Sequence, residues 1–135
     1  NEKMPIMLMV ILVLLMIQLQ HFGKTLMVLA DGRPACAIVA ADRELAMKAL
    51  AAALGAKSAA MMPPADAERV TGYKVGGVSP FGQRRRVPIV IDKAAISWAE
   101  IYLNGGRRGL QVRIAPSDAV ALLGATLASI TPTRG

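Results

Sequence analysis

Apolar and polar positions follow a clear pattern from residue 24 onward. Two apolar runs, at residues 25–30 and 34–40, flank Asp31-Gly32-Arg33, and this arrangement predicts a β-hairpin. Leucines then recur near helical spacing, with Asp42 placed to act as N-cap and Gly55 placed just past the end. We therefore expect a helix over residues 43–54, followed by a short strand at 58–62.

The second half of the chain alternates short strands and short helices. A helix is expected at 63–70, where prolines and acidic residues open the segment and Thr71-Gly72 closes it. The remaining segments are a strand at 87–91, a turn or short helix at 92–98, strands at 100–103 and 110–114 paired across a glycine turn, a helix at 116–123 and a strand at 126–130. The pattern predicts an α/β (α+β) fold with a mixed, largely antiparallel sheet and flanking helices.

The first residues differ from the rest. Residues 4–17 form an uncharged apolar run, which is shorter than the ~20 residues that a membrane-spanning helix needs. A secretory signal would have a basic start and a small-residue cleavage site, and neither is present. A buried helix or a pair of core strands is the default interpretation, and membrane attachment is the less favoured one. We expect residues 1–22 to be an atypical apolar segment and residues 23–135 to form one domain.

Composition narrows the classes of partner. The net charge of +7 and the pI near 10.2 favour nucleic acid or another polyanion. The aromatic content of 4% argues against a wide base-stacking platform. With one cysteine and one histidine, the chain lacks the ligands of a Cys-His metal site and cannot form an intrachain disulfide. We expect Cys36 to act as a small buried hydrophobe and the protein to work in a reducing cytoplasm.

The candidate chemistry lies in the stretch TGYKVGGVSPFGQRRR, residues 71–86. Its glycines allow the backbone to approach another molecule closely, and a block of arginines follows. The alternative is a mobile basic surface loop. The stretch lacks the spacing of a nucleotide-binding P-loop. Together with Lys24-Thr25 and the basic glycine turn at 104–109, it could hold a phosphate or ribose, or direct backbone N–H groups at an oxyanion, an effect of roughly 2.7–4 kcal/mol per donor.

Four segments together resemble a known family. GKTLMVLADG, LAAALGAK, TGYKVGGVSPFGQRRRVPIVID and IYLNGGRRGLQVRI, in this order, are similar to the YbaK-type aminoacyl-tRNA deacylases, relatives of the editing domain inserted into bacterial prolyl-tRNA synthetase. The resemblance covers about residues 23–130. It implies a barrel-like core and a cytoplasmic enzyme that hydrolyses the ester of a mischarged tRNA, typically tRNA(Pro) carrying alanine or cysteine. It also implies that no metal or cofactor is used, and that prolyl-tRNA synthetase is a possible partner.

The same resemblance implies roles for individual residues. Lys24 would bind near the tRNA 3′ end, while Gly76 and Gly77 would present backbone groups to the scissile ester. A bound water, or the thiol of a cysteinyl substrate, would be the nucleophile. The residues expected to bind substrate are Thr25, Gly72, Tyr73, Val78, Ser79, Pro80, Asn104, Gly105 and Gln111. The residues expected to contact tRNA phosphates are Arg84, Arg85, Arg86, Arg107 and Arg108.

Three departures from the family pattern bear on specificity. Cysteine-specific members usually carry a serine where this chain has Asn104, and an aspartate where it has Gln111. The apolar N-terminal segment replaces the strand and polar helices with which members normally begin. These differences weaken the case for cysteine and leave an alternative open, namely a non-catalytic module of the same fold that grips tRNA or a synthetase.

Overall fold

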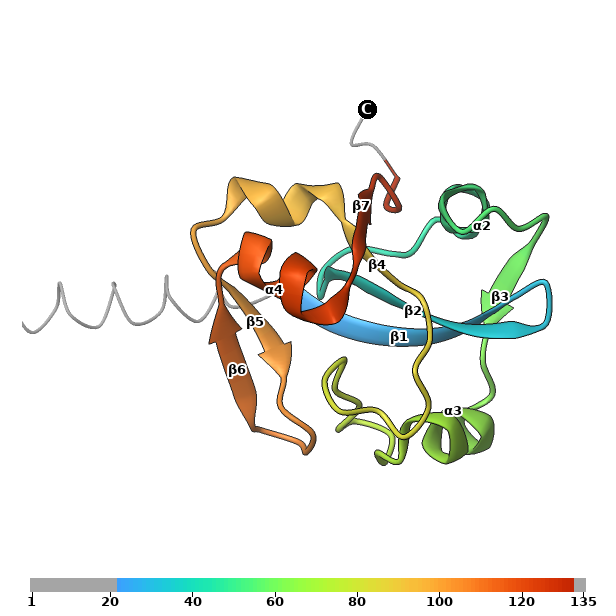
Figure 1. The fold of residues 1–135 in the computed structure, drawn as a ribbon, viewed down its shortest axis with the longest axis horizontal. Helices are drawn as coiled ribbons and strands as arrows, with labels where there is room; N and C mark the ends of the chain where they lie inside the picture. The colour runs from blue at the N-terminus through green and yellow to red at the C-terminus, as the bar shows by residue number, and fades with distance from the viewer. Residues whose placement is uncertain (1–21, 133–135) are drawn as a thin grey trace, which may run out of the picture.

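A five-stranded sheet in the order β3-β1-β2-β4-β7 organises the computed structural model, which describes residues 22–132 (Figure 1). A two-stranded antiparallel ribbon of β5 and β6 stands beside it. The strands are β1 (Phe22–Ala30), β2 (Arg33–Ala40), β3 (Ala59–Met61), β4 (Ile89–Asp92), β5 (Ile101–Asn104), β6 (Gln111–Ile114) and β7 (Thr126–Ala128). The helices are α2 (Met47–Ala53), α3 (Pro64–Thr71), the 3-10 helix η1 (Lys93–Ser97) and α4 (Pro116–Leu123).

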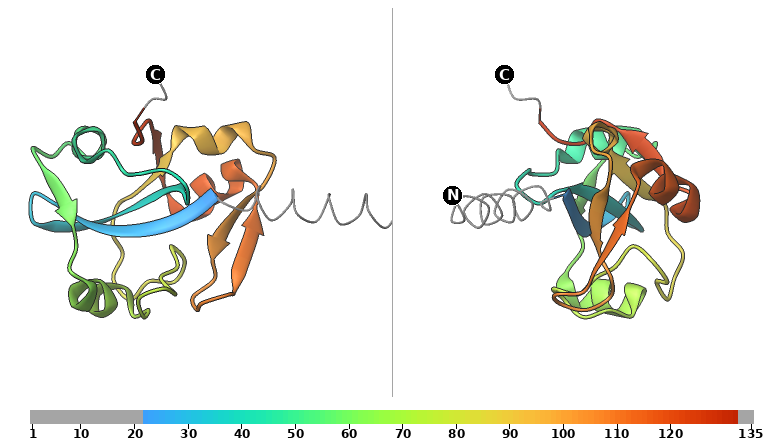
Figure 2. Two further views of the ribbon diagram at one scale, coloured as in Figure 1. Left: turned by 180° about the vertical axis from the view of Figure 1, so that it is seen from behind. Right: turned by 90° about the vertical axis from the view of Figure 1, so that its left-hand side faces the viewer.

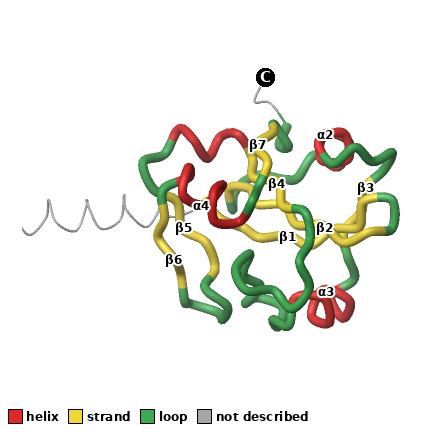
Figure 3. The backbone as a smooth tube through the Cα atoms, in the orientation of Figure 1, coloured by secondary structure: helices red, strands yellow, loops and turns green. Residues whose placement is uncertain are grey.

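The sheet is mixed, as the sequence pattern predicts. β1 pairs antiparallel with β2 and with β3, whereas β2–β4 and β4–β7 are parallel. Parallel neighbours need crossover connections, and here η1 and α4 lie between β4 and β7 in the chain (Figure 3). The α/β fold class is confirmed.

Both faces of the sheet are covered, which explains why its strands are apolar almost throughout. Alternate residues of β1 and β2 enter two separate clusters: Met27 and Ile38 belong to one, Val28 and Val39 to the other. The first cluster also contains residues of α3, β5 and α4, and the second contains Leu50 of α2. Helices thus lie on opposite sides of the sheet (Figure 2).

The predicted hairpin is confirmed, and its turn is anchored. Asp31 and Gly32 have φ values of 49° and 79°, the left-handed conformation that a tight hairpin turn requires. The Asp31 carboxylate accepts hydrogen bonds from the backbone N–H groups of Lys57 (3.0 Å) and Ser58 (3.1 Å). The turn is therefore tied to the connection between α2 and β3.

The start of α2 differs from the prediction. Asp42 is not the N-cap, because the helix begins at Met47 and its N-cap is Ala46, which makes no side-chain cap bond. The Ala46 N–H donates to the Ile130 carbonyl at 2.7 Å. This contact with a distant residue holds the preceding segment in a non-helical connection and overrides the local helix signal.

The other predicted helix ends are confirmed. Both α3 and α4 have a proline in the first turn and end at a left-handed glycine, Gly72 and Gly124 respectively. The left-handed Gly55 follows the end of α2 as predicted. The predicted strands and the short helix at 92–98 are all present with ends shifted by up to a few residues.

The apolar run at residues 4–17 and its predicted burial lie outside the described residues. The division at residue 22 stays a prediction. Within residues 22–132, no helix is long and apolar enough to cross a membrane. No group of three or more His, Cys, Asp or Glu side chains in that part of the chain is arranged to hold a metal ion.

Candidate functional site

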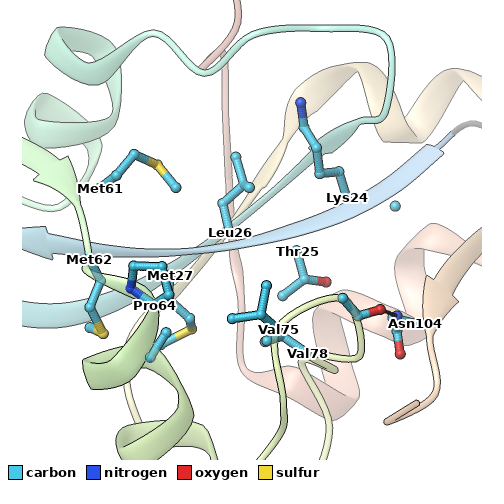
Figure 4. Close-up of a pocket in the computed structure, with 13 residues that line it drawn as sticks. Lys24, Thr25, Leu26, Met27, Met61, Met62, Pro64, Val75, Val78 and Asn104 are labelled. Atoms are coloured by element: carbon cyan, nitrogen blue, oxygen red, sulfur yellow. Dashed lines mark hydrogen bonds between the residues drawn. The ribbon is translucent and has the colours of Figure 1, made fainter. Parts of the chain in front are cut away.

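A cavity of about 360 Å³ lies between β1, the start of α3 and the glycine-rich loop, residues 72–82 (Figure 4). Side chains alternate along β1, so Thr25 and Met27 point toward the loop while Lys24 and Leu26 project from the other side of the strand. The residues that line the cavity are Gly23, Lys24, Thr25, Leu26, Met27, Met61, Met62, Pro64, Ala67, Val75, Gly76, Val78 and Asn104.

Apolar side chains form most of the cavity wall. Met27, Met62 and Ala67 are buried, and they belong to the core cluster beneath the cavity. Met61 and Val75 are 50% and 56% exposed, so they stand at the mouth. The cavity is therefore an apolar recess that is open to solvent on one side.

Thr25 places a polar atom in this recess. Its Oγ1 is the one buried side-chain oxygen or nitrogen without a hydrogen-bond partner among the described residues. Leaving a buried hydroxyl unpaired costs free energy, so such an atom is usually satisfied by water or by a ligand. Thr25 Oγ1 is therefore a buried, unsatisfied polar atom within the wall of the cavity.

The glycine-rich loop lies across the cavity from Thr25, and Gly76 and Val78 belong to its lining (Figure 4). The Gly77 N–H donates to the Lys74 carbonyl at 2.9 Å, which closes a turn within the loop. The Gly76 carbonyl accepts from Asn104 Nδ2 at 3.2 Å. Within residues 22–132, the N–H groups of Gly76 and Val78 donate to no protein acceptor. These two amides, rather than that of Gly77, remain for a ligand.

Close packing against the β5–β6 turn explains why glycines occupy this loop. A Cβ on Gly77 would lie 2.9 Å from the Arg107 Cα, and one on Gly76 would lie 2.9 Å from the guanidinium of Arg108. The Gly76 backbone also has a φ of 87°, which other residues rarely adopt. The two basic glycine turns are thus in direct contact beside the cavity.

Lys24 lines the cavity, but its ammonium group does not enter it. The Nζ atom donates to the Arg43 carbonyl at 2.9 Å, in the connection that precedes α2. Its direction follows from the alternation of side chains along β1. The register with β2 is regular from Lys24 to Ala30, so Lys24 lies on the same face as Leu26 (Figure 4).

Several predicted substrate-binding residues lie outside the cavity wall. Ser79 is buried, its Oγ accepts from the Phe81 N–H at 3.1 Å, and its carbonyl accepts from Gln83 Nε2 at 2.9 Å. The Tyr73 hydroxyl donates to the Phe81 carbonyl. These bonds shape the loop from within. The predicted residues that do not line the cavity are Gly72, Gly77, Tyr73, Ser79, Pro80, Gly105 and Gln111.

The predicted phosphate-binding arginines divide into two groups. Arg107 and Arg108 are exposed and contact the glycine loop beside the cavity. Arg84, Arg85 and Arg86 are also exposed, but the Arg84 side chain packs at Gly72 and that of Arg86 at Gly124. Only the first group adjoins the mouth of the cavity through Gly76.

The sequence did not single out the methionines of the cavity, Met27, Met61 and Met62. Met27 lies two residues after Thr25 on the same strand, so strand alternation could have placed it on the same face. Met61 and Met62 directly precede the prolines that open α3, and only the tertiary structure brings them to β1.

Cys36 is fully buried in β2, as expected, and takes no part in the cavity. Burial raises the pKa of its thiol from 9.0 to about 12, an effect that a hydrogen bond from Gln83 partly offsets. The thiol is therefore an inert part of the core at neutral pH.

The chain is similar in sequence to proteins of one known family. The family model of the aminoacyl-tRNA editing domain matches residues 13–122. A protein of Enterococcus faecalis that carries the name Cys-tRNA(Pro)/Cys-tRNA(Cys) deacylase EbsC is 35% identical over 98 residues, or 73% of this chain and 60% of its own length. The proline–tRNA ligase of Nitratidesulfovibrio vulgaris strain DP4 is 44% identical over 59 residues, or 44% of this chain and 10% of the ligase.

Solved structures share the fold. The hypothetical protein APE2540 superposes with a TM-score of 0.76 at 25% identity, covering 84% of this chain and 75% of that one. A structure described as a trans-editing enzyme for prolyl tRNA synthetase gives a TM-score of 0.74 at 24% identity, covering 82% of this chain and 69% of that one.

The family match includes the cavity, the glycine-rich loop and the β5–β6 turn. The match begins at residue 13, inside the apolar N-terminal segment. The chain spans 60% of the length of EbsC. The match over residues 13–122, together with the shared fold, confirms the resemblance to the YbaK-type proteins: the chain belongs to the aminoacyl-tRNA editing domain family.

Proposed function

We propose that this chain is an aminoacyl-tRNA deacylase, which hydrolyses the ester between a mischarged amino acid and the tRNA 3′ end. The substrate would be tRNA(Pro) carrying alanine or cysteine, and the enzyme would act in trans in the cytoplasm. One observation carries the proposal: the cavity wall brings the unpaired Thr25 hydroxyl together with Gly76 and Val78, whose N–H groups donate to no protein acceptor within residues 22–132. Its apolar wall suits a small apolar aminoacyl group.

The reaction requires a nucleophile and a site for the charge that develops on the ester oxygen. Water attacks the carbonyl carbon, and the carbonyl oxygen becomes the oxyanion of a tetrahedral intermediate. The N–H groups of Gly76 and Val78 are the donors that remain for this oxygen. The intermediate then breaks its bond to the ribose oxygen, which takes up the proton that the attacking water loses, and the amino acid leaves.

Positioning supplies most of the rate in this scheme. No carboxylate or imidazole of the described residues lines the cavity, so no side chain there is suited to act as general base. Removing one oxyanion-hole donor costs about 2.7–4 kcal/mol in other enzymes, and an aminoacyl ester is already reactive. Orienting the ester and one water between Thr25 and the glycine loop is therefore the main task of the protein.

The tRNA would approach across the basic turn. Arg107 and Arg108 stand beside the cavity and suit the phosphates of the acceptor end, whereas Arg84–Arg86 suit phosphates farther from the ester. Lys24 would leave the Arg43 carbonyl and bind the terminal ribose or phosphate.

The decisive experiment follows ester loss from mischarged tRNA(Pro). Alanyl, cysteinyl and seryl esters are incubated with the purified chain, with Thr25→Val and with Lys24→Ala. The proposal expects the wild type to hydrolyse at least one ester, and Thr25→Val, which keeps the shape but lacks the hydroxyl, to be slower. An unchanged rate for Lys24→Ala would show that this lysine serves as an anchor for the Arg43 backbone.

The second candidate function is a non-catalytic module that binds tRNA or prolyl-tRNA synthetase. The hydrogen bond from Lys24 Nζ to the Arg43 carbonyl favours this non-catalytic role, because the bond keeps the ammonium group out of the cavity. Salt-sensitive binding of tRNA(Pro) with no hydrolysis of any of the three esters would support this alternative and contradict the first.

A further inference from the structure

We infer that Asn104 is a positioning residue that fixes the direction of the Gly76–Gly77 peptide, and with it the donor groups of the glycine loop. This inference rests on the proposed deacylase function and goes beyond it by assigning Asn104 to the protein main chain instead of the substrate. It also gives a structural role to a position at which the chain departs from the serine of cysteine-specific relatives.

Asn104 connects the two glycine turns with both ends of its amide. Its Nδ2 donates to the Gly76 carbonyl at 3.2 Å (Figure 4). Its Oδ1 accepts from the Gly106 N–H at 2.8 Å. The first bond spans a separation of 28 residues. The second holds the amide in place on its own turn. Asn104 also lies at the end of β5, where the paired ribbon gives its backbone a fixed position.

The bond to Gly76 acts on a peptide group that is held on its opposite side as well. In a trans peptide, the carbonyl and the following N–H point in opposite directions. Asn104 binds the Gly76 carbonyl, while the Lys74 carbonyl accepts from the Gly77 N–H at 2.9 Å. The two bonds together prevent this peptide from rotating.

Packing alone would not have this effect. The Gly76–Gly77 segment lies close enough to Arg107 and Arg108 to exclude a Cβ, which fixes its distance from the β5–β6 turn. Contact between backbone atoms leaves the peptide plane free to turn, however, because glycine tolerates many φ and ψ combinations. The directional hydrogen bond of Asn104 selects one of them.

The consequence concerns the neighbouring amides. A rotation of the 76–77 peptide changes ψ of Gly76 and φ of Gly77. Where these two changes do not cancel, the rotation moves the flanking peptides that carry the Gly76 and Val78 N–H groups. These are the loop donors that remain for an oxyanion. Asn104 would therefore influence the chemical step while its own side chain stays bonded to protein.

Asn104→Asp tests this inference most directly. The carboxylate can still accept from the Gly106 N–H, but it cannot donate to the Gly76 carbonyl. Asn104→Ala removes both bonds. Ser97→Ala is the matched control, because it deletes a side-chain bond to the backbone, Ser97 Oγ to the Ala94 carbonyl at 2.7 Å, on an exposed helix outside the cavity.

Two measurements are made on each variant. In deacylation assays, both Asn104 variants should lower kcat by about tenfold to a hundredfold with little change in KM for tRNA, since displaced donors mainly affect the transition state. In hydrogen exchange followed by mass spectrometry, peptides covering residues 72–82 should exchange faster, while peptides covering β1 and β2 should not. Ser97→Ala should match the wild type in both.

The two readouts separate this inference from the proposed function. If the wild type hydrolyses no ester, the proposed function fails, and exchange alone decides whether Asn104 orders the loop. If the enzyme is active and Asn104→Asp retains wild-type kcat and exchange, the inference is wrong. A rise in KM without a fall in kcat would also overturn it, because that result would make Asn104 a substrate contact.

Discussion

The β1–β2 hairpin and the two glycine turns are built by opposite means. The hairpin consists of neighbouring strands that pair over their whole length, and its central side chains, such as Val28 and Ile38, are completely buried. The turns at 72–82 and 104–109 carry few buried side chains. They are held by isolated hydrogen bonds, such as that of Asn104, and by glycines packed against backbone.

This difference separates stability from chemistry. Substitutions in the hairpin remove buried apolar contacts, so they should change the free energy of unfolding and leave the geometry of the remaining folded molecules intact. Substitutions in the turns remove few buried contacts, but they shift the main chain that faces the cavity.

Ile38→Ala should lower the free energy of unfolding by about 2–5 kcal/mol, because it leaves a cavity in a fully buried cluster. Denaturant unfolding measures the change. Ile96→Ala is the control: the same atoms are removed from a side chain that is 55% exposed, and the expected change is within about 0.5 kcal/mol. Equal costs at the two positions would contradict the assignment of the hairpin as the core.

Gly77→Ala should reduce deacylation by about a hundredfold, since the new Cβ would lie 2.9 Å from the Arg107 Cα and must displace one of the turns. The midpoint of denaturant unfolding should move much less than for Ile38→Ala. Gly55→Asn provides a comparison at a left-handed glycine with open space around it, and it should hydrolyse the ester at the wild-type rate. A large loss of stability in Gly77→Ala would mean that the turns belong to the core.

Alkaline pH should weaken the hairpin through Cys36. Burial raises the pKa of this thiol from 9.0 to about 12, so above pH 9 the unfolded chain loses the proton while the folded chain keeps it. The stabilising effect is complete below pH 9 and declines toward pH 12, by up to about 1.4 kcal/mol per pH unit. The test compares unfolding of wild type and Cys36→Ala from pH 7 to 10. Parallel curves would show that the thiol does not contribute.

Arg107→Ala and Arg108→Ala should each lower the salt dependence of tRNA binding. The slope of log K against log salt concentration should become less steep by about one for each phosphate that the variant no longer neutralises. Filter binding at several salt concentrations measures it. Arg113→Ala is a matched control, because Arg113 is exposed and paired with Glu100 at 3.2 Å on the same ribbon. An equal change in the salt slope for all three arginine variants would indicate that tRNA binding depends on net charge and not on the position of the arginines beside the cavity.

Local signals in the sequence were sufficient for most of the fold. The Asp31-Gly32 turn and the proline and glycine ends of α3 and α4 each depend on residues adjacent in the chain. The late start of α2 depends on a bond to Ile130, which no local pattern contains. The fold class could therefore be predicted well, and the exact helix start could not.

The candidate site was predicted less completely, for the same physical reason. Thr25, Gly76, Val78 and Asn104 line one cavity, and their roles in binding or catalysis stay predictions. The hydrogen bond of Lys24 to the Arg43 carbonyl and that of Asn104 to the Gly76 carbonyl join residues 19 and 28 positions apart in the chain. Ser79 lies inside the loop, where its hydroxyl accepts from a local N–H.

The contacts of Ile130 have a consequence for how the protein is made. Ile130 is fully buried in the same cluster as Val28, and its N–H donates to Asp92 Oδ1 at 3.0 Å. β7, which just precedes it, pairs with β4 in the large sheet. During synthesis β1 and β2 leave the ribosome before β7, yet their core stays open until residue 130 has emerged. The domain should thus complete its folding only after residue 130 is available, and nascent chains that stall before β7 should be sensitive to proteases.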